Sequence, residues 1–236
     1  TFSGCTALTS LVIPSSVTSI GDNAFDKCGL SSLILPEGLE TIGNYAFSGC
    51  TALTSIEIPS TVTYMGTNAF ANSGLTTLTF PAGVSIGDNA FNGIPLTSVT
   101  VTGDISRSFG SDYTRMPWYG TSAPVAVILP DDATTIGDSM FRGSKVSTVT
   151  FPENLGAIGS NAFHSCKQLT SLEIPSTVTT IGNYAFYKCN MTSLTFPAGA
   201  TIGQYTFYDI YLTSITVVGD VSRSFESDCT IMPWYT

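Results

Sequence analysis

The chain has 236 residues, of which 43% are hydrophobic and 11% are charged, and its formal net charge is −9. This composition supports a buried core and differs from that of disordered chains, which combine high charge with few aromatic residues. The 8 basic residues form no cluster, which argues against a nucleic-acid ligand and an anionic membrane surface, since both require grouped Lys and Arg. No apolar run approaches the roughly 20 residues of a membrane-spanning helix.

A proline recurs every 22 or 23 residues within each half of the chain. The positions are Pro14, Pro36, Pro59 and Pro81, and then Pro130, Pro152, Pro175 and Pro197. The sequence around each proline reads L-x-x-L-x-L-P-x-x-V-x-x-I-G-x-x-A-F-x-x-C. A fixed period of this length is typical of a solenoid, and the chain accommodates about ten coils of 22–23 residues. Two coils are irregular and carry Gly103 or Gly219 in place of the proline.

Each coil begins with a strand pattern. In the first coil Leu11 and Ile13 should point inward while Ser10 and Val12 point outward, because side chains alternate along a strand. The proline then ends the strand, since it has no N–H for a ladder bond. The following Ile-Gly pair predicts a turn that needs positive φ or close backbone packing. The Ala-Phe pair predicts a short helical turn or tight loop whose Phe fills the interior.

One coil cannot bury these side chains alone, so the coils must stack. Stacking places the strands in a parallel sheet about 4.8 Å apart and the phenylalanines in one column. The column consists of Phe2, Phe25, Phe47, Phe70, Phe91, Phe141, Phe163, Phe186 and Phe207. The predicted fold is a β-rich solenoid, with the parallel sheet on one face and short helical turns and loops on the other.

A longer repeat contains the coils. A shift of 116 residues lays Pro14 on Pro130 and the segment Met116–Tyr119 on Met232–Tyr235. We therefore expect one solenoid over residues 1–236, built of two duplicated blocks at about 1–119 and 120–236. Residue 1 falls in the middle of a coil, so we also expect a fragment of a longer array, with any targeting signal outside it.

Coils of the form L-T-S-I-x-I-P-S-T-V-T-x-I-G-x-x-A-F-x-x-C resemble the BspA-like leucine-rich repeat family. The resemblance covers nearly the whole chain, and the two irregular coils depart from it. It implies a leucine-rich repeat solenoid from a cell-surface or secreted protein of bacteria or some protists, commonly one that adheres to host proteins or other cells. The family offers no catalytic residues to transfer.

Five cysteines occupy the position three residues after the column phenylalanine: Cys5, Cys28, Cys50, Cys166 and Cys189. Other coils place Ser or Ile there, which indicates a small interior slot and favours buried free thiols. Disulfides between stacked coils are the alternative, although parallel side chains in register bridge poorly. Zinc is less favoured, because its ligands usually come in close pairs. Cys229 lies off this column, and its state is left open.

Catalytic and metal-binding motifs are missing from the sequence. His164 is the only histidine, which favours a solvated loop residue, and there is no G-x-S-x-G motif. Asp22, Asp88 and Asp138 each follow a glycine and are interpreted as turn formers, since a calcium loop needs a denser set of oxygens. We therefore predict no enzyme activity, no metal and no cofactor.

The outward strand positions are rich in Ser and Thr and form the candidate binding face. Its residues are Ser55, Glu57, Thr77, Thr79, Ser98, Thr100, Thr148, Thr150, Ser171, Glu173, Ser193 and Thr195. In leucine-rich repeats the strand face usually binds the ligand. The alternative is that Ser and Thr simply suit an exposed parallel strand. The sequence leaves both interpretations open.

The irregular coils supply a second candidate site, the aromatic loop. Its residues are Arg107, Tyr113, Arg115, Trp118, Tyr119, Trp234 and Tyr235. Trp, Tyr and Arg are the residue types that dominate protein interfaces. A structural role is the alternative, in which Phe109 belongs to the core and Trp118 covers a gap between coils.

The expected function is a non-catalytic surface or secreted module that mediates adhesion through the Ser/Thr-rich strand face. Its partner would be a protein or glycan on a host or neighbouring cell. The alternative is a structural spacer that holds another domain away from the cell surface. The sequence identifies neither the ligand nor the oligomeric state.

Overall fold

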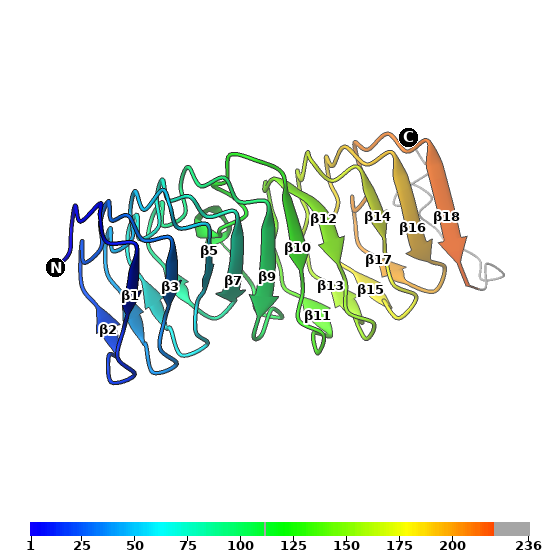
Figure 1. The fold of residues 1–236 in the computed structure, drawn as a ribbon. Coiled ribbons are helices and arrows are strands. Elements are labelled where there is room, and N and C mark those ends of the chain that lie inside the picture. Colours follow the sequence, from blue (N-terminus) through cyan, green and yellow to red (C-terminus); the bar gives the residue numbers. More distant parts are fainter. Residues whose placement is uncertain (111, 220–236) are drawn as a thin grey trace. The chain divides into compact units, whose positions relative to one another are not determined.

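The computed structural model describes residues 1–110 and 112–219. The chain divides into two compact units, the first formed by Thr1–Gly103 and Thr114–Val125, the second by Asp104–Tyr113 and Ala126–Thr236. Each unit repeats one coil, in which a strand, a proline turn, a two-residue strand and a run of tight turns follow one another (Figure 1). This arrangement confirms the predicted parallel-strand solenoid.

In the first unit the longer strands pair in parallel. They are β1 (Ser10–Val12), β3 (Ser32–Ile34), β5 (Ser55–Glu57), β7 (Thr77–Pro81) and β9 (Ser98–Thr102). A second parallel sheet consists of β2 (Ser19–Ile20), β4 (Thr41–Ile42), β6 (Tyr64–Met65) and β8 (Ser85–Ile86). Equivalent residues of successive coils face each other in both sheets, so the sequence repeat and the strand register coincide.

The second half of the chain repeats this arrangement. Its longer strands are β10 (Val125–Ile128), β12 (Val146–Thr150), β14 (Ser171–Glu173), β16 (Ser193–Pro197) and β18 (Ser214–Val218). Its short strands are β11 (Thr135–Ile136), β13 (Ala157–Ile158), β15 (Thr180–Ile181) and β17 (Thr201–Ile202). The described residues contain one helix, the 3₁₀ helix η1 (Asp112–Arg115), in the irregular coil.

Two local predictions are refined by the structure. The isoleucine of each Ile-Gly pair belongs to a short strand of the second sheet and not only to a turn. The Ala-Phe pair, for which a helical turn or a tight loop was predicted, forms tight turns. Alternate N–H groups there donate to the next coil, as Phe25 N does to Ala46 O (2.8 Å), while those between them bond locally, as Cys28 N does to Phe25 O (3.1 Å). A helix would direct all of these bonds along its own axis.

The phenylalanine column forms the core of each unit, as predicted. In the first unit, rings of adjacent coils stack with centroids 5.0–5.6 Å apart from Phe2 to Phe91. In the second unit, the separation is 5.0–5.6 Å from Phe141 to Phe207. Phe163 is fully buried, whereas Phe2 is 46% exposed.

The glycines of the Ile-Gly pairs are required by close approach between coils, and not by positive φ. A Cβ on Gly43 would lie 2.6 Å from Asp22 N, and one on Gly66 would lie 2.5 Å from Asn44 N. The sequence left both explanations open, and the structure selects close packing. At Gly21 the space is open, because a Cβ there would have nothing within 4 Å.

The Asp or Asn that follows this glycine joins adjacent coils. Asp22 Oδ1 accepts a hydrogen bond from Asn44 N (2.7 Å), and Asn44 Oδ1 accepts one from Thr67 N (2.8 Å). In the second unit Asp138 Oδ1 accepts one from Ser160 N (2.7 Å). These side chains were predicted to form turns within a coil, and the structure adds a role between coils.

Gly43→Ala should destabilise the protein by about 1–3 kcal/mol, because the new methyl group overlaps the backbone of the preceding coil. Gly21→Ala is the matched control, since it changes the same residue of the neighbouring coil where space is available. We expect the control to shift stability by less than about 1 kcal/mol. Urea denaturation followed by circular dichroism measures both, and equal effects would contradict the close-approach explanation.

Phe163→Ala should cost about 3–5 kcal/mol, because it removes a fully buried ring from the column. Hydrogen exchange should show the loss of protection centred on the neighbouring coils, since each coil contacts mainly its neighbours. The half-exposed Phe2→Ala variant provides the comparison and should lose much less stability. A uniform loss of protection over the whole chain would argue against local coupling.

Candidate ligand-binding face

The outward side chains of β5, β7 and β9 form two columns on the strand face. Backbone pairing sets Ser55 beside Thr77 and Thr77 beside Ser98, and it sets Glu57 beside Thr79 and Thr79 beside Thr100. The residues between them point inward and are buried, namely Ile56, Leu78 and Val99. The alternation along each strand therefore divides the hydroxyl groups of the surface from the aliphatic core.

In the first unit these side chains line a shallow hollow of about 340 Å³. Its polar lining consists of Ser55, Glu57, Thr77, Thr79, Ser98 and Thr100. The same face becomes apolar toward β1 and β3, where Val12 is 88% and Ile34 is 85% exposed. Glu57 is thus the only charged group among the described residues that line this hollow.

The second unit carries a matching hollow of about 370 Å³ on β14, β16 and β18. Its polar lining consists of Thr148, Ser171, Glu173, Ser193, Thr195, Ser214 and Thr216. Glu173 holds the position that Glu57 holds 116 residues earlier. Thr150 is exposed at the end of β12 but does not line the hollow.

The threonine that precedes each of these strands has a different role. Thr76 Oγ1 donates to Thr54 O and Thr97 Oγ1 donates to Thr76 O, both at 3.1 Å. In the second unit Thr213 Oγ1 donates to Thr192 O at 3.1 Å. Threonine at this position therefore connects coils, whereas the hydroxyl groups on the strands face outward.

The aromatic loop is divided between the two units. In the first unit Trp118 is fully buried and packs edge-on against Phe80, with ring centroids 6.1 Å apart. Arg115 is exposed, and its Nε lies 2.8 Å from Asp88 Oδ1. Tyr119 is 36% exposed, so Arg115 and Tyr119 are the loop residues that this unit presents to solvent.

The other loop residues belong to the second unit or lie outside the described residues. The Arg107 guanidinium lies 4.7 Å from the ring centre of the buried Phe109, and the Arg142 guanidinium lies 5.3 Å from that of Tyr113. Trp234 and Tyr235 fall outside the described residues. The described part of the predicted set thus includes a buried core residue, Trp118, as well as exposed residues such as Arg115.

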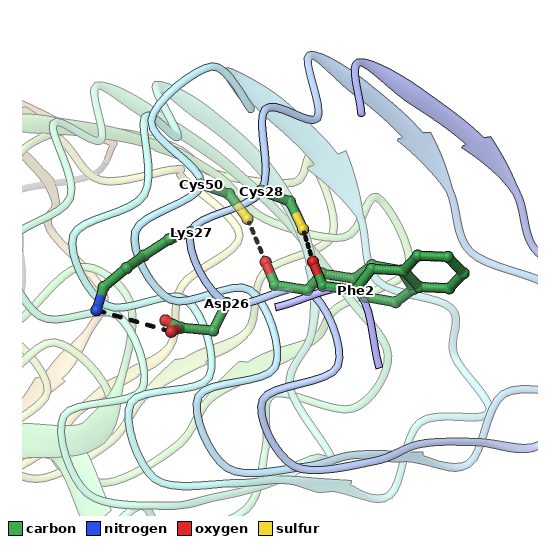
Figure 2. A network of polar contacts seen from close by, with 6 residues as sticks. Phe2, Asp26, Lys27, Cys28 and Cys50 are labelled. Carbon is green, nitrogen blue, oxygen red and sulfur yellow. Dashed lines mark hydrogen bonds and ion pairs between the residues drawn. The ribbon is translucent and has the colours of Figure 1, made fainter. Parts of the chain in front are cut away.

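Four column cysteines are buried thiols, and Cys5 is exposed. Figure 2 shows Cys28 and Cys50, whose Sγ atoms donate to the carbonyl oxygens of Phe2 and Phe25 at 2.8 and 3.1 Å. Cys166 and Cys189 make the same contact in the second unit, both at 2.9 Å. Burial raises the pKa of Cys50 to about 11, so this thiol is protonated near neutral pH. Cys229 lies outside the described residues.

His164 is half-buried, whereas the sequence predicted a solvated loop residue. Its ring stacks on Tyr187 with centroids 4.9 Å apart, and its Nδ1 lies 2.9 Å from Ser165 Oγ. Burial lowers the pKa of His164, and the nearby positive charge of Arg142 lowers it further. A catalytic histidine is usually oriented by a carboxylate, whereas the charged groups that act on this one are cationic.

Metal-binding clusters and membrane-spanning helices are both missing from the described part of the chain. Across residues 1–110 and 112–219, no group of three His, Cys, Asp or Glu side chains is arranged to hold a metal ion. Over the same ranges, no helix has the length and apolar character needed to cross a membrane.

The fold and its outward hydroxyl columns define the class of leucine-rich repeat solenoids. The family model for the BspA type leucine rich repeat region, which comprises six repeat copies, matches residues 1–111 and 119–229. The chain belongs to this family. No curated protein sequence matches it.

Several solved structures are similar to this chain. A leucine-rich repeat protein from Bacteroides ovatus is 25% identical over 92% of this chain and 62% of its own, with a TM-score of 0.49. A leucine rich cell surface protein from Faecalibacterium prausnitzii is 20% identical over 90% of this chain and 79% of its own (TM-score 0.41). The pneumococcal vaccine antigen PcpA is 19% identical over 90% and 69% (TM-score 0.36). The chain thus spans less than two thirds of the Bacteroides ovatus protein.

Thiol labelling should separate Cys5 from the other column cysteines. In a Cys229→Ser background, one thiol of the native chain should react rapidly with DTNB at pH 8, because Cys5 is exposed and the other four are buried. All five should react in denaturant. Rapid labelling of two or more thiols in the native state would contradict the buried column, and a Cys5→Ser variant identifies the fast site.

Proposed function

We propose that the chain is a non-catalytic binding module of a cell-surface or secreted protein, and that its strand face binds a protein or glycan partner. The observation that carries this proposal is the pair of matching hollows on the two units. Each is lined by outward Ser and Thr hydroxyl groups and one glutamate, at equivalent positions of the repeat.

The chemistry of this face suits recognition of a polar, extended ligand. Hydroxyl groups both donate and accept hydrogen bonds, so they can pair with backbone amides or with sugar hydroxyls. The short Ser and Thr side chains leave the hollows open and lose little conformational entropy on binding. Glu57 and Glu173 add one negative charge to each hollow, which favours a ligand that carries donors or positive charge.

A location on the cell surface or in the secreted fraction forms part of the proposal. It is supported by membership of the BspA-type family, which the resemblance of the coils associates with cell-surface and secreted proteins, and by the similar protein from Faecalibacterium prausnitzii, which is described as a cell surface protein. A module at either location is exposed to molecules outside the cell. The proposed partner is accordingly a protein or glycan on a host or neighbouring cell.

A structural spacer is the second candidate function. It is favoured by the 116-residue duplication, which we propose extends one array through two blocks at about 1–119 and 120–236. Added coils lengthen a repeat array without requiring new binding chemistry. A spacer would tolerate substitutions on the strand face.

The variant Thr77→Glu/Thr100→Glu/Ser193→Glu/Thr216→Glu tests the strand face, because it places two charges in each of the two hollows. We expect at least a tenfold loss of binding to cells or to captured surface proteins, because two unpaired charges would enter the interface at a cost of about 2–5 kcal/mol. Labelled chain titrated on cells, measured by flow cytometry, reports the affinity.

Ser60→Glu/Ser85→Glu/Ser176→Glu/Thr201→Glu is the matched control, because it adds the same charge at exposed positions away from the face. Melting temperatures of both variants establish that the chain remains folded. Unchanged binding by the face variant, together with loss of adhesion when residues 120–236 are deleted from the full-length protein, would favour the spacer.

A further inference from the structure

The turn side of the second unit carries a column of side chains directly after the column phenylalanines. Its members are Arg142, His164, Tyr187 and Tyr208. The backbone sets them in register, because Gly143 N donates to His164 O (2.7 Å), Ser165 N to Tyr187 O (2.7 Å) and Lys188 N to Tyr208 O (3.0 Å). One such residue therefore occurs in each of four successive coils.

The rings of this column stack along the array. The centroid of His164 lies 4.9 Å from that of Tyr187, which lies 5.6 Å from that of Tyr208. A parallel column places Tyr184 on Tyr205 at 5.2 Å, and the two columns meet edge to face. The tyrosines remain accessible, since Tyr205 and Tyr208 are 48% and 55% exposed.

Two of these tyrosines occupy a backbone conformation in which asparagine is more common. Tyr184 and Tyr205 have φ values of 57° and 56°, in the left-handed region. Asparagine tolerates this region well, and Asn68 and Asn89 occupy the two positions 116 residues earlier with φ values of 54° and 58°. Tyr45 in the first unit has the same conformation (φ 56°), so this position accepts an exposed tyrosine in either unit.

Positive charge gathers on the same side. Four of the chain's 8 basic residues fall within four positions after a column phenylalanine of the second unit: Arg142, Lys145, Lys167 and Lys188. Lys188 Nζ lies 5.1 Å from the ring centre of Tyr187. Burial is the main cause that lowers the pKa of His164, and the positive charges of Arg142, Lys188 and Lys167 lower it further. The positive charge of this surface therefore comes from the Lys and Arg side chains and does not require a protonated His164.

The acidic groups nearby are engaged in local contacts. Asp138 Oδ1 accepts from Ser160 N, and Asp209 Oδ1 accepts from Tyr211 Oη at 3.3 Å. The turn side of this unit is therefore enriched in basic and aromatic residues within a chain whose formal net charge is −9.

The duplicated block provides an internal comparison. The residues 116 positions before the column are Asp26, Ser48, Ala71 and Asn92, none of which is basic or aromatic. Figure 2 shows Asp26 beside Lys27, which lies 3.8 Å from its carboxylate. The strand face differs little between the blocks, with Glu57 matched by Glu173. The blocks thus share one face and differ in the chemistry of the other.

We propose that a basic aromatic patch, formed by Arg142, His164, Lys167, Tyr187, Lys188 and Tyr208, binds an acidic polysaccharide. The Lys and Arg side chains pair with sulfate or carboxylate groups. The tyrosines offer apolar ring surface together with hydroxyl groups, which match the apolar faces and hydroxyl groups of sugars. An acidic peptide would use the cations equally well but would leave the row of tyrosine hydroxyl groups without a role.

A size-defined heparin oligosaccharide is the probe, titrated against the 236-residue chain by isothermal titration calorimetry at low and moderate salt. Arg142→Gln/Lys188→Gln should weaken binding at least tenfold and reduce its salt dependence, since fewer charge pairs form. Tyr187→Ala/Tyr208→Asn installs the residues of the first block and should weaken binding about fivefold or more with the salt dependence retained.

Lys27→Gln/Arg115→Gln is the control, because it makes the same change of net charge in the first unit and should stay within about twofold of the unaltered chain. Thermal melts establish the folding of every variant. The proposal is overturned by an absence of heparin binding at low salt, or by equal losses in the control and the charge variant. Binding of poly-L-glutamate as tight as heparin, with no effect of the tyrosine substitutions, would assign the patch to acidic peptides instead.

This site is independent of the proposed strand-face function. Thr77→Glu/Thr100→Glu should leave heparin binding unchanged, and the patch variants should leave strand-face binding unchanged. Failure of either proposal is therefore distinguishable from failure of the other.

Discussion

The structure depends on backbone hydrogen bonds that run from coil to coil, even through the turns. On the turn side, alternate N–H groups donate to the next coil, while those between them close local turns. This pattern satisfies the buried backbone groups without a helix. It also fixes the distance between coils, which determines how closely the phenylalanine rings stack and why Gly43 and Gly66 cannot carry a side chain. The thiol of each buried column cysteine adds a side-chain bond in the opposite direction, to a carbonyl oxygen of the preceding coil.

Much of this fold could be predicted from the sequence, because its repeat places each residue type at one position of the coil. The proline period, the strand alternation at Leu11 and Ile13 and the phenylalanine column all follow from that repeat. The second sheet was missed because a two-residue strand such as Thr41–Ile42 is too short to show alternation. The choice between a helical turn and a tight loop on the turn side could not be made from the sequence, because it is set by bonds to a residue about 22 positions away, which local propensity does not report.

The candidate sites were less accessible to sequence reasoning. The strand-face residues could be named because they alternate with buried ones along a strand. The buried state of Trp118 depends on its contact with Phe80 and has no local signature. The stacking of the turn-side tyrosines escaped notice because the stacked rings come from different coils, and only the register between coils brings them together. Comparing the blocks position by position would have found them, since Ala71 and Asn92 correspond to Tyr187 and Tyr208.

The alternating bonds of the turn side also constrain how the length of a coil can vary. The turn side runs from the isoleucine of the second sheet to the residue three positions after the column phenylalanine. This segment spans eight positions from Ile20 to Cys28, and it also spans eight from Ile136 to Ser144, where a serine replaces the cysteine. One inserted residue there would exchange the N–H groups that point to the next coil with those that bond locally. Among the regular coils, insertions fall in other loops, as between Cys50 and Leu53, where one residue more is present than between Cys28 and Leu30. The irregular coil is the exception, because its extra residues, with helix η1, lie between Ile105 and Thr121. The turn side can therefore change its side chains freely while keeping their spacing constant, which makes it a surface on which recognition can diverge between copies of the repeat.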